Sequence, residues 1–182
     1  MILDLMIWSP VIVGLILLLI GKNATSLSYW LSLTTSLLVF GMSMYALSMF
    51  KADQVGIQFE LIAPWIERFN INYHLGIDGI SFPLILLTTF ITPIVILTAR
   101  TSNKINLHQY LASFLILEGL MIGVFSALDA FLFYVFWEAM LIPMFIIIGI
   151  WGGENRVYAT IKFFLYTFLG SVFMLIAIIY LY

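Results

Sequence analysis

Long apolar runs alternate with polar segments along the whole chain. Each run has the length of about 20 residues that a helix needs to cross the hydrocarbon core of a bilayer. The runs predict membrane helices at Ile2–Ile20, Leu27–Phe50, Ile80–Ala99, His108–Leu128, Ala130–Ile150 and Tyr158–Tyr182. Short polar joints separate most of them, at Gly21–Ser26, Arg100–Asn106 and Gly152–Arg156. Such joints favour antiparallel neighbours in a bundle, so the pattern predicts an all-α polytopic membrane protein with residues 1–182 as a single membrane domain.

The one long joint, Lys51–Gly79, carries a different pattern. In its later part every second residue is apolar, at Phe69, Ile71, Tyr73, Leu75 and Ile77. Alternation with a period of two indicates a β-strand, and Gly56–Leu61 alternates more weakly. We therefore expect a small hairpin lying over one end of the bundle, the alternative being an irregular loop. Asp78, just before the third predicted helix, is expected to cap the start of that helix.

The composition supports a membrane protein and excludes several kinds of site. Hydrophobic residues make up 64% of the 182 residues and charged residues 9%, against about 25% charged residues in an ordinary soluble domain. The chain has no cysteine, which excludes disulfides, thiolate-held iron–sulfur clusters and cysteine zinc sites within it. A formal net charge of −2 gives no basic surface for nucleic acid. The sequence contains no phosphate-binding loop, metal-spaced His/Glu cluster or nucleophilic triad.

The charged residues of the joints predict the orientation. With the N-terminus outside, the inner joints carry more basic residues than the outer ones. The inner joints then hold Lys22, Arg100, Lys104 and Arg156, and the outer joints Lys51 and Arg68. Because basic residues concentrate on the inner side, we place the N-terminus and the hairpin outside. The acidic Asp4 precedes the first base, the opposite of the order in a cleaved signal peptide, so Met1–Ile20 is predicted to remain as a membrane helix.

Glu138 is the most unusual residue within the apolar runs, since it lies inside DAFLFYVFWEAMLIPMFIIIG at Asp129–Gly149. A charged side chain at the centre of a membrane helix costs about 2.5–3.5 kcal/mol or more, and such residues are mostly functional. Pro143 follows five residues later and frees a backbone carbonyl near the acid. An acid beside a helix irregularity in the membrane is typical of an ion or proton path. The alternative is a structural acid held by Tyr134, one turn earlier.

Glu118 and Lys162 are the other ionisable residues well inside the predicted helices. Glu118 lies about ten residues before the turn at Leu128–Asp129 and Glu138 about ten after it, so both are expected roughly 15 Å deep. If the two carboxylates share a site, desolvation and repulsion would hold a proton there near neutral pH. Lys162 is expected roughly 12 Å from the depth of Glu138, too far for a direct ion pair. The alternatives are a purely structural Glu118 and a Lys162 side chain that reaches the membrane surface.

Three segments of the chain resemble one known family. They are YHLGIDGISFPLILL at Tyr73–Leu87, EGLMIGVFSALDAFLFYVFWEAMLIPMFIIIGIWG at Glu118–Gly152 and YATIKFFLYTFLGSVFML at Tyr158–Leu175. Within them FWEAMLIPM is the most specific phrase, and the resemblance extends from about residue 70 to the end. The family is that of the proton-translocating, antiporter-like membrane subunits of respiratory complex I, the NADH:quinone oxidoreductase.

The resemblance implies a membrane-arm subunit that lies beside related antiporter-like subunits. Glu138 would be the family's key glutamate, which pairs with a lysine on a seventh helix, and the N-terminus and a hairpin would lie outside. Our leading hypothesis adds Glu118 and Lys162 to the proton path. Quinone reduction would drive proton transfer, with the flavin, the iron–sulfur clusters and the quinone in other subunits. The expected location is an energy-coupling membrane, a bacterial inner membrane in preference to a mitochondrial one.

Family members have more helices than are predicted here, including the seventh with its lysine. We expect the chain to be the N-terminal part of a longer protein, a truncated gene model or one piece of a split subunit. Its apolar end, IAIIYLY, favours truncation. Alone, Glu138 would lack its counter-charge, so it would hold a proton and be inactive in pumping.

Two other functions fit the same residues. Related modules occur in multisubunit cation/proton antiporters and in membrane-bound hydrogenases, and neighbouring genes would distinguish these from complex I. The third hypothesis is a non-transporting membrane scaffold in which both acids are structural. Replacing Glu118 and Glu138 together with Gln would then alter assembly but not coupling.

Overall fold

A computed structural model describes residues 1–20, 25–51, 53–54, 56–100 and 105–181. Lys22 and Lys104, used to predict the orientation, and Tyr182, the predicted end of the last helix, lie outside the described residues. The helices are α1 Ile2–Ile20, α2 Thr25–Met49, α3 Ser81–Ala99, α4 Leu107–Ser126, α5 Ala130–Trp151 and α6 Arg156–Leu181. Each is long and apolar enough to cross a membrane. The predicted helical membrane fold is confirmed, with boundaries that agree within two residues where the chain is described.

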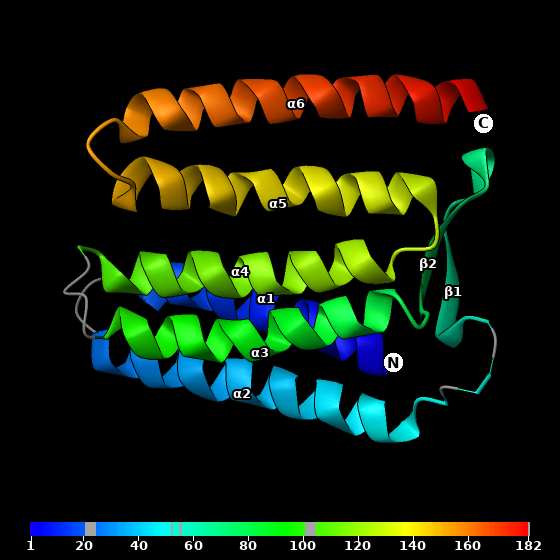
Figure 1. Ribbon diagram of the computed structural model, residues 1–182, viewed down its shortest axis with the longest axis horizontal. Helices are drawn as coiled ribbons and strands as arrows, with labels where there is room; N and C mark the ends of the chain where they lie inside the picture. Colours follow the sequence, from blue (N-terminus) through cyan, green and yellow to red (C-terminus); the bar gives the residue numbers. More distant parts are fainter. Residues whose placement is uncertain (21–24, 52, 55, 101–104, 182) are drawn as a thin grey trace.

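The helices lie side by side and run alternately up and down, with the two chain ends at the same end of the bundle (Figure 1). The central helix is α4, which packs against α1, α2, α3 and α5. In contrast, α6 lies outermost and packs on α5, with Phe145 and Phe164 in edge-to-face contact at 5.5 Å between ring centroids. Thr160 and Ser171 are the buried residues of α6. Most of the α6 surface therefore faces outward.

Small residues allow α1 and α4 to approach closely. A Cβ atom at Gly119 of α4 would collide with the carbonyl oxygen of Ile7 on α1, and would come within 2.6 Å of Val11. On the opposite helix, a Cβ at Gly14 would lie 2.9 Å from the carbonyl oxygen of Ala112. Membrane helices use small residues in this way because close backbone approach increases van der Waals contact.

The long joint forms the predicted hairpin. Strand β1, Gln58–Ile66, pairs antiparallel with β2, Ile71–Ile77, through the short turn η2, Glu67–Phe69. The prediction of β2 is right for Ile71 to Ile77, but it was wrong to include Phe69, which lies in the turn. In β1 apolar and polar residues alternate only weakly. Two irregularities interrupt its pairing register with β2, one between Gln58 and Leu61 and one between Pro64 and Ile66.

The hairpin lies over the end of the bundle where α4 turns into α5 (Figure 1). Leu128 donates its backbone N–H to the His74 carbonyl at 2.9 Å, and Asn72 donates its N–H to Asp129 Oδ2 at 3.2 Å. At the start of α3, Asp78 Oδ1 accepts the N–H groups of Ser81 at 2.7 Å and Ile80 at 3.0 Å, as predicted for a cap. The bond from Ser81 is the main reason that the pKa of Asp78 lies below its usual value.

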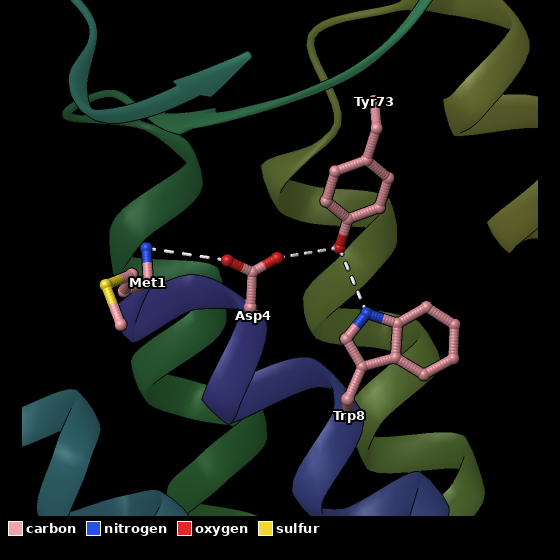
Figure 2. Close-up of polar contacts among 4 residues, drawn as sticks. All are labelled: Met1, Asp4, Trp8 and Tyr73. Carbon is pink, nitrogen blue, oxygen red and sulfur yellow. Dashed lines mark hydrogen bonds and ion pairs between the residues drawn. The ribbon is translucent and has the colours of Figure 1, made fainter. Parts of the chain in front are cut away.

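A polar cluster joins the hairpin to the first turns of α1 (Figure 2). Tyr73 of β2 donates its hydroxyl proton to Asp4 Oδ1 at 3.0 Å, and Trp8 donates its indole N–H to the Tyr73 hydroxyl at 3.1 Å. The amino group of Met1 lies 3.4 Å from Asp4 Oδ2. Burial raises the pKa of Tyr73 to about 12, so the phenol stays protonated and remains a donor to Asp4 at neutral pH.

Substitution of Tyr73 by Phe is expected to loosen the hairpin from α1. The change removes the donor to Asp4 and the acceptor for Trp8, at a cost of about 1 kcal/mol per bond. Backbone amides of β1 and β2 should exchange hydrogen at least about fivefold faster in the variant. Tyr45→Phe, which changes an exposed side chain on α2, is the matched control. Equal exchange in Tyr73→Phe and wild type would contradict the prediction.

Candidate functional site

Glu138 lies on α5 at mid-membrane depth. It comes eight residues after Ala130, the first residue of α5, which corresponds to about 12 Å from that end of the helix. The residue is half-buried, and its Oε1 is buried without a hydrogen-bond partner among the described residues. Tyr134, one turn earlier, interacts with the Glu138 carboxylate and with Ser171 of α6. The acid therefore lies by the contact between α5 and α6.

Pro143 adds a second polar group to this part of α5. It is a buried residue inside the helix, and its missing N–H leaves the carbonyl of Ala139, four residues earlier, without its helical partner. Ala139 directly follows Glu138, so a carboxylate and a freed carbonyl occupy the same turn. Such a turn can accept hydrogen bonds from water or from a protonated group.

Glu118 lies at the same depth on α4 but next to a different helix. It comes eight residues before Ser126, the last residue of α4, again about 12 Å from the end of the helix. The residue is 1% exposed and borders an open, mostly apolar groove between α3 and α4, but neither of its carboxylate oxygens is accessible from that groove. Neither carboxylate oxygen has a hydrogen-bond partner in the described part of the chain, Glu138 included. Each acid thus lies eight residues from the end of its helix at the turn between α4 and α5, and the two acids make no hydrogen bond to each other.

Lys162 lies nearer the opposite end of the bundle. Helix α5 ends at Trp151 and α6 begins at Arg156, so both counts start from the same end of the bundle. Lys162 lies six residues from this end and Glu138 lies 13 residues from it. The difference of seven residues corresponds to about 10 Å along the helices. The Lys162 side chain is exposed, and its Nζ lies 5.6 Å from the ring centroid of Tyr158 and 5.9 Å from that of Tyr166. The two aromatic faces, one turn before and one turn after Lys162, can attract its ammonium group.

Sequence reasoning missed a layer of buried hydroxyl groups on helices α2 and α3. Its members include Ser32, Ser36 and Ser43 of α2 and Thr88, Thr89 and Thr92 of α3, and Thr88 and Thr92 line the groove toward α4. The Oγ atoms of Ser43 and Thr89 lie 2.8 Å apart and join the two helices. Helical spacing of Ser32, Ser36 and Ser43 was the signal that could have shown a polar face. The layer places hydroxyl groups close to the helix that carries Glu118.

The chemistry available at these positions is proton binding and release. Buried carboxyls, a phenol and a freed carbonyl can hold a proton or a water molecule. The described residues bring together no group of three His, Asp or Glu side chains that could hold a metal ion. His108, at the second position of α4, is 3% exposed, and its Nδ1 has no hydrogen-bond partner in the described ranges.

The last third of the chain is similar to a known family of proteins. Residues 126–182 match the family model described as NADH:quinone oxidoreductase/Mrp antiporter, TM. The matched segment contains α5 with Glu138 and all of α6 with Lys162. Glu118 lies outside it.

Similarity to individual proteins extends over the whole chain. The sequence is 42% identical over 184 residues to NADH-quinone oxidoreductase subunit M of Rickettsia prowazekii, covering 100% of this chain and 38% of that protein. It is 48% identical over 162 residues to subunit M of Rhodobacter capsulatus, covering 89% of this chain and 31% of that protein. NADH-ubiquinone oxidoreductase chain 4 of Marchantia polymorpha is 43% identical over 95% of this chain and 35% of its own length.

The structure gives the same result. It matches a chain of respiratory complex I from Thermus thermophilus with a TM-score of 0.82 at 30% identity, covering 98% of this chain and 35% of the matched chain. The resemblance inferred from the sequence is therefore confirmed. The chain spans 38%, 31% and 35% of the lengths of these three curated relatives.

Proposed function

We propose that this chain, related in sequence and fold to subunit M and chain 4 of NADH:quinone oxidoreductases, is part of a proton-translocating subunit in the membrane arm of such a complex. The proposal rests mainly on Glu138. It is a half-buried carboxyl at mid-membrane depth, with one oxygen unpartnered among the described residues, within the segment that matches the family model. Burial of such a group is too costly to be expected from packing alone.

In this proposal Glu138 binds and releases the transferred proton. Tyr134 and the freed carbonyl of Ala139 lie beside it and can orient a water molecule toward the carboxyl. Lys162 supplies a positive charge nearer the inner surface, and its depth difference of about 10 Å from Glu138 requires water between them. Glu118 provides a second proton-binding group at the depth of Glu138.

The proposal assigns the redox chemistry to other subunits. The flavin, the iron–sulfur clusters and the quinone would be held elsewhere in the complex, and quinone reduction there would drive protonation changes in this chain. Its neighbours would be antiporter-like membrane subunits and lipid. Residues 1–182 would form one membrane domain with the N-terminus and the hairpin outside, in an energy-coupling membrane such as a bacterial inner membrane. By themselves these residues are expected not to pump, because Glu138 has no basic partner within the described ranges.

A multisubunit cation/proton antiporter is the second candidate. The matching family model covers both NADH:quinone oxidoreductases and Mrp antiporters, so residues 126–182 alone favour neither. The antiporter would exchange Na⁺ or K⁺ for protons without any NADH-linked electron transfer.

Deletion of the gene, followed by complementation, distinguishes the two functions. We expect inverted membrane vesicles without the chain to lose NADH-driven acidification and to regain it when the gene is restored. Sodium-driven proton exchange in the same vesicles should stay unchanged. Loss of sodium-driven exchange with normal NADH-driven acidification would instead identify the antiporter.

A further inference from the structure

The outward face of α6, the outermost helix of the bundle, carries a positive charge (Figure 1). Beyond its first residue, Arg156, the helix has Lys162 as its one charged side chain, and it has no acidic residue. Lys162 is exposed, and no ion pair joins it to an acid among the described residues. Its ammonium group lies between the rings of Tyr158 and Tyr166, one turn away on either side. The face therefore presents a cation that no described carboxylate neutralises.

The position of Lys162 along α6 lets its ammonium group reach the surface of the bilayer. The 26 residues of α6 span about 39 Å, against about 30 Å for the hydrocarbon core. A helix of this length that is centred in the bilayer extends about 4–5 Å beyond the core at each end. Lys162 lies about 9 Å from the start of the helix, and hence about 4–5 Å inside the core. Lysine side chains at such a depth extend their charged end to the lipid headgroups.

Two shallow apolar grooves begin beside Lys162 and share Ile161 as a common wall. The first has a volume of about 400 Å³ and follows α6 past Leu165 to Leu169. The second has a volume of about 390 Å³ and lies between α6 and α5, with Ile146 among its α5 residues. Ile161 is 51% exposed and Leu165 is 59% exposed, so the grooves open outward from the bundle.

The order of polar and apolar groups along α6 indicates the chemistry of a ligand. The ammonium group of Lys162 and the hydroxyl of Tyr158 lie toward the membrane surface, and the groove continues past Leu165 toward the middle of the helix. A phospholipid has the same order, with a phosphate above two acyl chains. A free phosphate ion would leave both grooves empty, and a zwitterionic headgroup would bring a second positive charge close to Lys162. Anionic lipids are attracted to basic residues near the membrane surface.

We propose that Lys162 and Tyr158 bind the phosphate of an anionic phospholipid, with one acyl chain in each of the two grooves beside Ile161. The lipid belongs to the leaflet at the end of the bundle opposite the hairpin, where α6 begins. This binding site goes beyond the proposed function and does not rest on it, since it requires only that the helices cross a membrane.

Photocrosslinking with phosphatidylglycerol that carries a diazirine on one acyl chain tests the site. The complete protein, in its native assembly, is purified into phosphatidylcholine nanodiscs with a subsaturating amount of this probe, and mass spectrometry locates the labelled residues. We expect labelling of residues 161–169 in the wild type. Lys162→Gln should lower it about fivefold, the effect of one basic residue near an anionic lipid. Lys162→Arg should keep most of it. Lys51→Gln, which removes an exposed base at the other end of the bundle, is the matched control and should label like the wild type.

Competition between lipids tests the charge of the headgroup. In the wild type, an excess of unlabelled phosphatidylglycerol should remove the labelling of residues 161–169, whereas the same excess of phosphatidylcholine should leave most of it. Equal competition by the two lipids would overturn the proposal, because the site would not select a negative headgroup. If Lys162→Gln fails to assemble, this comparison in the wild type still decides.

Two further results would contradict the lipid site. A wild type without label in residues 161–169 would show that another protein segment covers this face of α6. Equal labelling of the wild type and Lys162→Gln would show that the ammonium group does not hold the lipid. Crosslinking requires no NADH and no proton transfer, so a failure of the proposed function in the vesicle assay would leave this result unchanged.

Discussion

Glu138→Gln is expected to abolish NADH-driven proton translocation by the assembled complex. The substitution keeps the size and the hydrogen-bonding shape of the side chain, but an amide cannot bind and release a proton in the physiological pH range. Glu138→Asp keeps a carboxyl that is one methylene shorter and should retain part of the rate. Acidification of inverted vesicles after NADH addition measures the effect.

Two controls make this result specific to Glu138. Native gel electrophoresis should show equal amounts of assembled complex in the wild type and in Glu138→Gln. Glu67→Gln changes an exposed acid in the turn of the hairpin and should pump at the wild-type rate. Full proton pumping by Glu138→Gln would end the proposal that this residue carries the proton.

Gly119→Ala is expected to destabilise the bundle, although it adds only one methyl group. The new Cβ would collide with the carbonyl oxygen of Ile7 and approach Val11, which belong to the tightly packed helix α1. Backbone atoms cannot move aside as a flexible side chain can, so the expected cost is at least about 1–3 kcal/mol. The yield of assembled complex and its thermal unfolding midpoint should both fall.

Gly41→Ala is the matched control for this second prediction. Gly41 also lies in a membrane helix, but a Cβ there would meet no atom within 4 Å. Its yield and unfolding midpoint should equal or exceed those of the wild type, since alanine is the better helix former. Equal effects of the two substitutions would contradict the role assigned to the contact between α1 and α4.

The helices were predictable from the sequence because a membrane imposes one simple requirement. A segment such as Ile2–Ile20 must be apolar over about 20 residues to cross the bilayer, whatever it packs against. Strand β2 was equally predictable, because apolar residues occupy every second position along it. The later half of β1 was not predicted, because Pro64 and the irregularity in register between Pro64 and Ile66 interrupt the period of two on which the prediction depends.

The position of the two acids along their helices was predictable from the sequence, but the neighbouring helix that each side chain faces was not. Counting residues from the turn between α4 and α5 places Glu118 and Glu138 at one level, since each residue of a helix rises 1.5 Å. Which neighbour each acid meets depends on helix rotation, which is set by contacts such as that of Gly119 with α1. The hydroxyl layer escaped notice for another reason. Residues such as Thr88 and Thr92 bond to their own helix and look like ordinary helix residues in sequence.

The most direct test of the central claim is an infrared difference spectrum of the assembled complex. Addition of NADH and quinone starts turnover, and carboxyl groups that gain or lose a proton change their C=O absorption. We expect a carboxyl band in the wild type and in Glu67→Gln that is missing in Glu138→Gln. Identical carboxyl bands in Glu138→Gln and the wild type would show that Glu138 keeps one protonation state during turnover, and would contradict its role as the proton carrier.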